Sequence, residues 1–436
     1  MSFRLNTFKP LNYEQQRMRV LIVVHAIVWL LLTVLVGKHI LVDEHRTASP
    51  FGITIQSAGP GSPYYRTTIV DLASIINFVN KTWLGQTSVK SGASVYSVDN
   101  HLKVTSEWAG KKVRNALPFG YSPTIFWILV PFIIFPNYLA FYLFDLMGLI
   151  SIWWITHPSR CRFGLGLLAF LSPLAQACFD LGQTALMTGV GLLFIAEKTK
   201  YENSVAGWRS SFLEGLALWA LTAKPPLALV ACSALVSLRK WRSLLVGGVL
   251  AVILTLVVSP LLGPNWVHDY MHLLSFYDRI NSGSIFAWSL VPSHMANLRA
   301  VLSVDLSLSD DIATRISAVL WLIAIMCIAL TGIRSKLSEG GIWALSLMSY
   351  LIFCPHVTST EELQLVLLIP LCIPTQNSLR WQELLILIVV TLLPFVSPAI
   401  GPLAGNRLIL FFAKILLFIF VIAYMTTKRA KVEIAH

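Results

Sequence analysis

Long apolar runs, separated by short basic or polar connections, make up most of the chain. The first run, Val20 to Val42, follows Arg17 and Arg19. It is longer than the apolar region of a signal peptide and lacks a clear small-residue cleavage site, so we predict an uncleaved first membrane span. Further apolar runs lie at about 122–136, 138–156, 163–179, 182–196, 208–223, 225–239, 242–262, 311–333, 341–356, 362–374, 382–399 and 406–427. The pattern predicts an all-α polytopic membrane protein with about 11–13 transmembrane helices, although several runs are shorter than the roughly 20 residues of a perpendicular span.

Two longer polar segments interrupt this pattern. Residues 43–120 are rich in Ser, Thr and Gly, and an amphipathic run within them extends from Leu72 to Leu84. Residues 263–310 mix aromatic side chains with polar ones, which suits carbohydrate or lipid-headgroup contact and equally suits an interfacial aromatic belt. We therefore predict one integral membrane domain, residues 1–427, with two larger external loops that carry amphipathic helices, and a cytoplasmic tail at 428–436.

The composition agrees with a membrane protein. Of the 436 residues, 56% are hydrophobic and only 12% are charged, whereas a soluble protein carries roughly 25% charged residues. The net charge of +12 indicates Lys and Arg in cytoplasmic connections and no nucleic-acid partner. The six cysteines are scattered without a CxxC pair, so neither a zinc site nor a disulfide framework is indicated.

The basic connections predict the orientation of the chain. Clusters of Lys and Arg occupy 157–162, 197–209, 239–242, 334–336 and 428–431. Placing these connections and the N-terminus in the cytoplasm satisfies the positive-inside rule. Residues 121–156 must then make one net crossing, which favours a re-entrant or half-membrane helix at 122–136 over a misplaced basic connection. Both termini are then cytoplasmic, and the two larger loops face outward.

A charge and two prolines interrupt one apolar stretch. Lys224-Pro225-Pro226 lies within Ser211 to Leu238, and an ionisable residue in a membrane segment is a functional candidate by default. Because both flanks are basic, the stretch must leave the cytoplasmic side and return, with the tripeptide at the outer turn. A lysine there suits a phosphate or carboxylate. Glu214 lies ten residues away, about 15 Å along a straight helix, so an ion-pair partner for Lys224 would have to come from another element.

A carboxylate in the first polar segment is a second candidate. Asp71 precedes the amphipathic run and can act as an acid in the first turn of a helix. It can equally act as a general base that removes a proton from an attacking hydroxyl. Asp43, Asp99 and Glu107 compete for this role, and the residue pattern leaves the choice open.

The remaining candidates lie at the ends of apolar runs. Tyr121-Ser122-Pro123 closes the first polar segment, where an interfacial aromatic and a proline near a helix start need no further function. His356 ends one run, and Glu361 and Glu362 begin the next. A histidine beside two carboxylates can bind phosphate or a metal or be structural, whereas a zinc site needs more ligands at defined spacing. The chain has no Walker, HExxH or GxSxG motif.

The order of these elements resembles the C-superfamily (GT-C) glycosyltransferases, and most closely glycosyltransferase family 87 of the polyprenol-phosphate-mannose-dependent type. The resemblance covers about residues 70–375 and is carried by Asp71-Leu72-Ala73, Ser94-Val95-Tyr96, Phe119-Gly120-Tyr121-Ser122-Pro123, Gly182-Gln183, Lys224-Pro225, Met295-Ala296-Asn297-Leu298-Arg299, Cys354-Pro355-His356 and Glu361-Glu362-Leu363. The chain departs from the family pattern where Cys354 replaces a Ser, Thr184 replaces an Asn, and Glu361-Glu362 replaces a Tyr-Asp pair.

The resemblance implies a GT-C-like helical bundle and a specific reaction. A hexose or pentose, mannose-like by preference, would move from a polyprenyl-phosphate-sugar donor to a hydroxyl of a lipid or glycan acceptor, with inversion, on the external or periplasmic face of an inner or plasma membrane. Asp71 would be the general base, and the cations Lys224, His356 and Arg299 would hold the donor phosphate. Tyr121, Gln183, Glu361 and Glu362 would bind substrate. Phosphate is already a good leaving group, so no metal or other cofactor is expected.

Two other functions fit parts of the pattern. A transporter or flippase of an amphiphilic glycolipid would explain the many spans and the interrupted helix, but transporters often show internal repeats, and none is visible. A glycan polymerase or ligase with a diphosphate-linked donor would favour several external arginines, which are few on the predicted topology. The first external loop, about 78 residues long, suits an enzyme better than a transporter.

Overall fold

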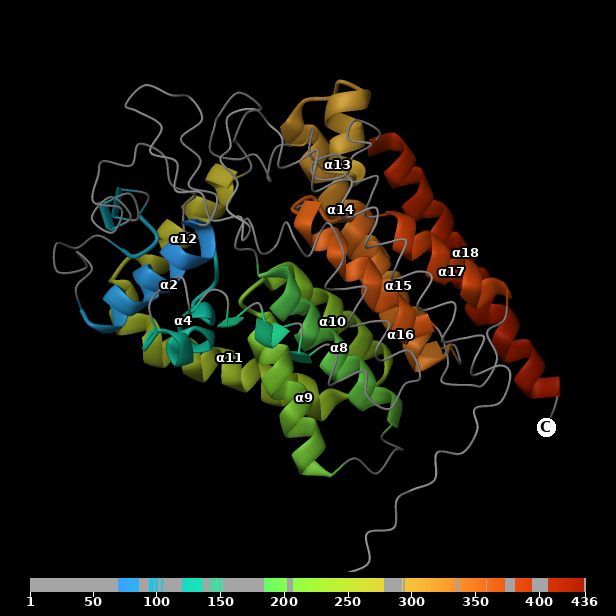
Figure 1. Cartoon of the computed structure of the whole chain (residues 1–436), viewed down its shortest axis with the longest axis horizontal. Coiled ribbons are helices and arrows are strands. Elements are labelled where there is room, and N and C mark those ends of the chain that lie inside the picture. Colours follow the sequence, from blue (N-terminus) through green and yellow to red (C-terminus); the bar gives the residue numbers. More distant parts are fainter. Residues whose placement is uncertain are drawn as a thin grey trace, which may run out of the picture.

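The computed structural model describes residues 70–85, 94–97, 99–100, 103–104, 120–135, 140, 143–144, 146–148, 150–151, 184–201, 207–277, 292, 295–334, 337–357, 359–372, 381–393 and 407–434. In chain order, the first described elements are α2 (Val70–Trp83), α4 (Ile125–Ile128), η2 (Val130–Phe132), α8 (Ala185–Tyr201), α9 (Trp208–Leu221), α10 (Pro225–Ser237), α11 (Trp241–Leu262) and α12 (Trp266–Tyr277). They are followed by α13 (Leu298–Ala300), η5 (Val301–Asp305), α14 (Asp310–Arg334), α15 (Glu339–Phe353), η6 (Ser359–Leu367), α16 (Leu368–Cys372), α17 (Trp381–Leu392) and α18 (Arg407–Ile434), as Figure 1 shows. Every element in these ranges is helical, which confirms the predicted all-α class.

Three described helices are long and apolar enough to cross a membrane. They are Trp241–Leu262, Asp310–Gly332 and Arg407–Tyr424, and they coincide with the predicted runs 242–262, 311–333 and 406–427. Three shorter apolar helices, Pro225–Ser237, Glu339–Phe353 and Trp381–Val390, accompany them. The chain is therefore a polytopic, membrane-associated helical protein. The predicted first span and the run at 163–179 lie outside the described residues.

Two of the predicted apolar runs, 122–136 and 362–374, fold as short helical segments. Residues 122–136 begin as α4 and continue as the 3₁₀ turn η2, which has a proline in its first turn. Proline lacks an N–H and clashes with the preceding helical turn, so no membrane-length helix forms here, which favours the half-membrane interpretation. The run at 362–374 lies in the 3₁₀ helix η6 and the short helix α16. Its described side chains up to Leu368 are buried.

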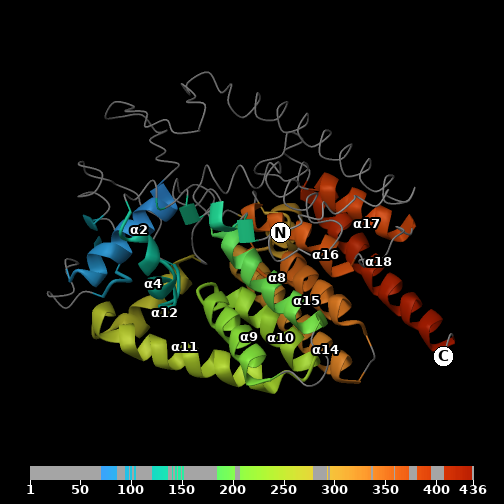
Figure 2. The same ribbon diagram turned by 60° about the horizontal axis from the view of Figure 1, so that its bottom comes forward.

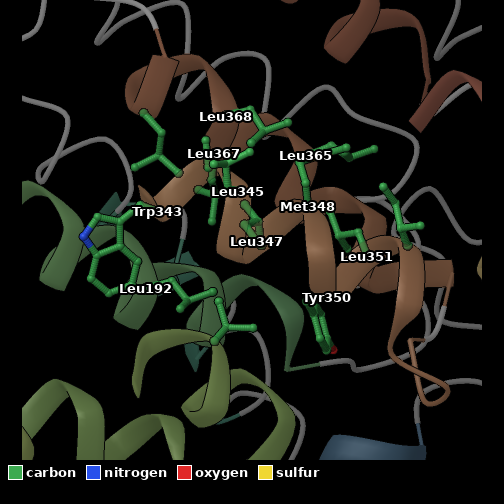
Figure 3. Packing of buried hydrophobic residues seen from close by; sticks show 14 of the residues in the cluster. Leu192, Trp343, Leu345, Leu347, Met348, Tyr350, Leu351, Leu365, Leu367 and Leu368 are labelled. Atoms are coloured by element: carbon green, nitrogen blue, oxygen red, sulfur yellow. The ribbon is translucent and has the colours of Figure 1, made fainter. Parts of the chain in front are cut away.

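Buried apolar side chains form two groups. The larger, leucine-rich group joins α8, α9, α10, α14, α15, η6, α16, α17 and α18, and Figure 3 shows part of it around Leu345, Met348 and Leu365. The smaller group joins α2, α4, α11 and α12. Figure 2 shows α8, α9 and α10 between the α2 side of the molecule and the α14–α18 side. Leu221 and Leu227 belong to the larger group and Ala223 to the smaller, so the α9–α10 break lies where the two groups meet.

Helices α9 and α11 approach each other closely at two glycines. A Cβ atom at Gly215 would lie 2.6 Å from the Val246 Cβ and 3.0 Å from the Gly247 backbone nitrogen. Small residues at such crossings let helix backbones pack closely in a membrane, where van der Waals contact drives helix association. A buried polar contact reinforces this pair, because Ser243 Oγ donates to Glu214 Oε2 at 2.5 Å.

Gly215→Ala should therefore separate α9 from α11 and lower the Tm measured in detergent, because overpacking costs about 1–3 kcal/mol. Gly248→Ala is the matched control, since no atom lies within 4 Å of a Cβ built at Gly248. Equal Tm values for the two variants would contradict the proposed close contact.

Candidate functional site

The predicted interruption at Lys224-Pro225-Pro226 is confirmed as a break between two helices. Helix α9 ends at Leu221, and α10 begins at Pro225, so the two prolines occupy the first helical turn, where a missing N–H costs little. The Lys224 backbone N–H donates to Leu221 O at 2.9 Å, and the Lys224 carbonyl accepts from Leu227 N at 2.9 Å. The lysine thus begins α10 at the end of a tight turn.

Lys224 forms an ion pair with Glu361, which lies in η6. The two side chains are 18% and 0% exposed, so each charge depends on the other in surroundings that solvate ions poorly. Glu214 instead contacts Ser243 and Lys240, with 3.5 Å between Lys240 Nζ and Glu214 Oε1. The prediction that Glu214 is not the direct ion-pair partner of Lys224, and that another element could supply one, is confirmed, because Glu361 of η6 pairs with Lys224.

The Cys354-Pro355-His356 turn lies beside this pair. Cys354 follows the last residue of α15 and is fully buried, whereas His356 is half-buried. Burial raises the pKa of the Cys354 thiol well above its usual value; the His356 backbone N–H lowers it, Glu361 raises it further, and Lys224 and Arg299 lower it. The thiol is therefore protonated at neutral pH, and Glu361, Lys224 and Arg299 all lie near this turn.

The segment before α14 is fixed onto the same turn. Asn297 Nδ2 donates to Cys354 O at 3.0 Å, and Arg299 Nη1 donates to Pro355 O at 3.4 Å. Arg299 Nε and Nη2 also donate to the two carboxylate oxygens of Asp310 at 2.9 and 2.6 Å. The Arg299 side chain is 1% exposed. Arg299, which the resemblance implies is a phosphate ligand, is thus held between Asp310 and Pro355 in this structure.

Glu361 and Glu362 are neighbours but point to different partners. Lys414 Nζ, on α18, lies 3.2 Å from Glu362 Oε1 and donates to Leu351 O at 3.1 Å. Both of these charged side chains are buried. The pair ties η6 and the end of α15 to α18, so it helps to fix the turn between them. The sequence analysis missed Lys414, although a lone lysine within the apolar run 406–427 is the same signal that identified Lys224.

The Tyr121-Ser122-Pro123 step contacts the α9–α10 break from the other side. Ser122 Oγ donates to Thr222 O at 2.5 Å, and Ser122 N donates to Ala223 O at 3.3 Å. The Tyr121 hydroxyl lies 3.3 Å from Thr184 Oγ1. Gln183, the residue before Thr184, lies outside the described residues. The step therefore adjoins the turn that carries Lys224.

Asp71 is the second residue of α2, and its side chain lies outside the described part of the structure. At its other end α2 packs on α4, because Trp83 Nε1 donates to Phe126 O at 3.0 Å and the Trp83 ring lies 5.2 Å from that of Trp127. Buried α2 side chains share the smaller apolar group with Ala223. The helix that carries Asp71 near its start thus packs in the same apolar group as Ala223 at the break.

The two predicted external loops also meet. Val95 N donates to Leu262 O at 3.0 Å, and the Tyr96 ring lies 4.8 Å from the Tyr270 ring of α12. Burial raises the pKa of Tyr270 to about 12, so its hydroxyl is protonated at neutral pH. The Ser94-Val95-Tyr96 motif is therefore a packing element that joins the first loop to α11 and α12.

No metal-binding cluster occurs among the residues that the structure describes: none of their His, Cys, Asp and Glu side chains gather in groups of three or more that could hold an ion. Metal independence stays a prediction. The arrangement instead offers one partly exposed ammonium group, Lys224, beside a half-buried histidine, and a cation of this kind can bind a phosphate group.

The sequence model of glycosyltransferase family 87 matches residues 119–355, more than half of the chain. The matched part contains Tyr121, Gln183, Lys224 and Arg299; Asp71 precedes it, and His356, Glu361 and Glu362 follow it. Comparison with curated proteins gives no match, and comparison with solved structures gives none either. The matched region brings together the α9–α10 break and the turn after α15, and on this match the chain belongs to glycosyltransferase family 87.

Proposed function

We propose that this glycosyltransferase moves a hexose or pentose, with a mannose-like sugar favoured, from a polyprenyl-phosphate-sugar donor to a hydroxyl of a lipid or glycan acceptor on the external face of the inner or plasma membrane. The observation that carries the proposal is the Lys224–Glu361 ion pair at the break between two apolar helices, beside the Cys354-Pro355-His356 turn. A lipid-linked donor would reach such a site sideways from the bilayer.

Lys224 is the cation best suited to the donor phosphate. It is partly exposed, whereas Arg299 is buried against Asp310, and a lysine ammonium is a compact point charge that binds phosphate well. Glu361 compensates this charge when no donor is bound, and the phosphate oxygens would then share or replace that partner. A cation held in this position would stabilise the negative charge that develops on the leaving phosphate.

Asp71 would serve as the general base. The acceptor oxygen attacks the anomeric carbon and forms the new C–O bond, while the bond from that carbon to the phosphate oxygen breaks. Asp71 takes the acceptor proton, and polyprenyl phosphate leaves with the bonding electron pair, so the configuration inverts. The packing of α2 against α4 and Ala223 supports a base on this helix.

The other predicted residues divide into two kinds. His356 lies on the turn after α15 and would add a second donor to the phosphate, while Tyr121, next to the α9–α10 break, and Gln183 would contact substrate. Glu361 would act through Lys224. Arg299 and Glu362 would be positioning residues, because their described contacts are Asp310 and Pro355 for the first and Lys414 for the second.

The alternative functions have less support. Membership of a glycosyltransferase family favours an enzyme over a transporter or flippase. A diphosphate-linked donor carries more negative charge than a monophosphate. At the break Lys224 is partly exposed, while the nearby Arg299 is already paired with Asp310, which favours a monophosphate donor over that of a polymerase or ligase.

Asp71→Asn should abolish measurable sugar transfer while leaving expression and donor affinity unchanged, because a general base contributes roughly 10²–10⁴-fold to the rate. An in vitro assay with a polyprenyl-phosphate mannose donor measures this. Asp99→Asn is the control, since Asp99 lies exposed in the same predicted loop. Wild-type transfer by Asp71→Asn would remove Asp71 from the mechanism.

Lys224→Met should weaken the affinity for polyprenyl-phosphate mannose roughly tenfold or more, since hydrogen bonds to charged groups contribute about 1.5–3 kcal/mol. The single variant leaves Glu361 buried without a cation, which destabilises the fold. The double variant Lys224→Met/Glu361→Gln removes both charges and isolates the effect on binding in a titration.

The matched control is Lys240→Met/Glu214→Gln. That pair has side chains 19% and 1% exposed, close to the 18% and 0% of Lys224 and Glu361, but it contacts α9 and α11 away from the break. Donor affinity equal in the two double variants would show that Lys224 does not bind the phosphate.

Asp310→Asn separates two roles for Arg299. If Arg299 positions the Cys354-Pro355-His356 turn, Asp310→Asn and Arg299→Lys should both lower the transfer rate, because each weakens the bidentate pair that holds the guanidinium. If Arg299 binds phosphate directly, freeing it from Asp310 should preserve or raise donor affinity. Steady-state kinetics and a donor titration on both variants distinguish these outcomes.

A further inference from the structure

One face of α14 carries three polar groups that are buried without a partner. Thr314, Ser317 and Trp321 are spaced three and four residues apart, which places them on the same side of the helix. Ser317 is 0% exposed and Trp321 6% exposed. Thr314 Oγ1, Ser317 Oγ and Trp321 Nε1 are all buried, and none of them forms a hydrogen bond with a described residue. Native proteins pair most buried polar atoms, so such a cluster requires an explanation.

The cluster lies at the same level as Lys224. Helices α10, α14 and α15 pack against one another, and Ser237 Oγ of α10 donates to Ile328 O of α14 at 3.0 Å. Lys224 at the start of α10 lies near the Cys354-Pro355 turn, and Asp310 at the start of α14 is joined to the same turn through Arg299. Because both helices begin at this turn, they run parallel. Eleven residues separate Ile328 from Ser317 and also Ser237 from Pro226. Equal rise along parallel helices therefore places Ser317 beside the start of α10.

A chain of contacts leads from the cluster to the turn beside the ion pair. The Trp321 ring lies 6.2 Å from the Tyr350 ring of α15, and the Tyr350 carbonyl accepts from Cys354 N at 3.0 Å at the start of that turn. Figure 3 shows Tyr350 at the edge of the leucine-rich group, with its hydroxyl pointing away from the labelled leucines. The polar groups of α14 thus face the same interior region as Glu361 and Lys224.

We propose that Thr314, Ser317 and Trp321 bind the sugar of the donor while Lys224 binds its phosphate; this rests on the proposed function. The three groups are neutral, and two of them both donate and accept hydrogen bonds, as sugar hydroxyls do. A polyprenyl chain offers no polar atom to them. A site built from buried polar groups discriminates strongly, because a ligand that lacks the matching hydroxyl leaves a protein group unpaired. These residues therefore determine which sugar the enzyme accepts.

The test compares the wild-type protein and two variants in their affinity for two lipids and in their Tm. Polyprenyl phosphate and polyprenyl-phosphate mannose are titrated against the detergent-solubilised full chain and its Ser317→Ala and Trp321→Phe variants, and the Tm of each protein is measured. We expect each variant to bind the mannose-bearing lipid about three- to tenfold more weakly, the effect of one lost hydrogen bond. Affinity for the sugar-free lipid should stay unchanged. The Tm of Ser317→Ala should stay the same or rise, since the change removes a polar atom without a hydrogen-bond partner among the described residues. The Tm of Trp321→Phe should fall, because that change also removes ring atoms packed in the buried core.

Ser237→Ala is the matched control and should give the opposite result. Ser237 is also buried, but its hydroxyl is bonded to Ile328 O, so removing it should lower the Tm and leave both affinities unchanged. Variants of Ser317 and Trp321 that bind both lipids as the wild type does would overturn the inference and leave the proposed function standing. Equal weakening for both lipids would also overturn it. A wild-type protein that binds neither lipid would overturn the inference together with the proposed function.

Discussion

The ion pair between a partly exposed lysine and a buried glutamate constrains the elements around it. If either charge loses its partner, the remaining ion is poorly solvated, so the elements that carry Lys224 and Glu361 must keep a fixed distance. This requirement joins the α9–α10 break to η6, two segments far apart in the chain. The turn after α15 lies near both charges, since Lys224 and Glu361 each affect the pKa of its Cys354 thiol. The geometry of the candidate site follows from this one interaction.

Two further ion pairs support the same end of the bundle. Arg299–Asp310 holds the segment before α14 against Pro355, and Lys414–Glu362 holds η6 and the end of α15 against α18. The Lys240–Glu214 pair, by contrast, joins α9 to the start of α11 and adjoins no turn that resembles the family pattern. Three pairs thus converge on one region. We interpret this convergence as the support that a phosphate-binding site requires, because a misplaced cation stabilises a transition state poorly.

The sequence predicted much of this arrangement, but it did not predict which residues form ion pairs. Apolar runs agree with the candidate membrane spans of α11, α14 and α18 to within a few residues, because length and hydropathy alone define such spans. The break at Lys224 was predictable, since two prolines and a charge cannot continue an apolar helix. Glu361 could not be identified as its partner, because no local pattern encodes contacts between distant elements. Asp310 was missed for the same reason, and the polar face of α14 was hidden by the apolar residues around it.

A structure of the protein with bound polyprenyl-phosphate mannose, determined by cryo-electron microscopy in a lipid environment, would test the assignment of Lys224 as the phosphate ligand. Phosphate density is expected within about 3–4 Å of Lys224 Nζ, a typical distance for a charge-assisted contact, with the sugar directed toward the buried polar face of α14. Phosphate density away from the α9–α10 break, with Lys224 still paired to Glu361, would contradict that assignment.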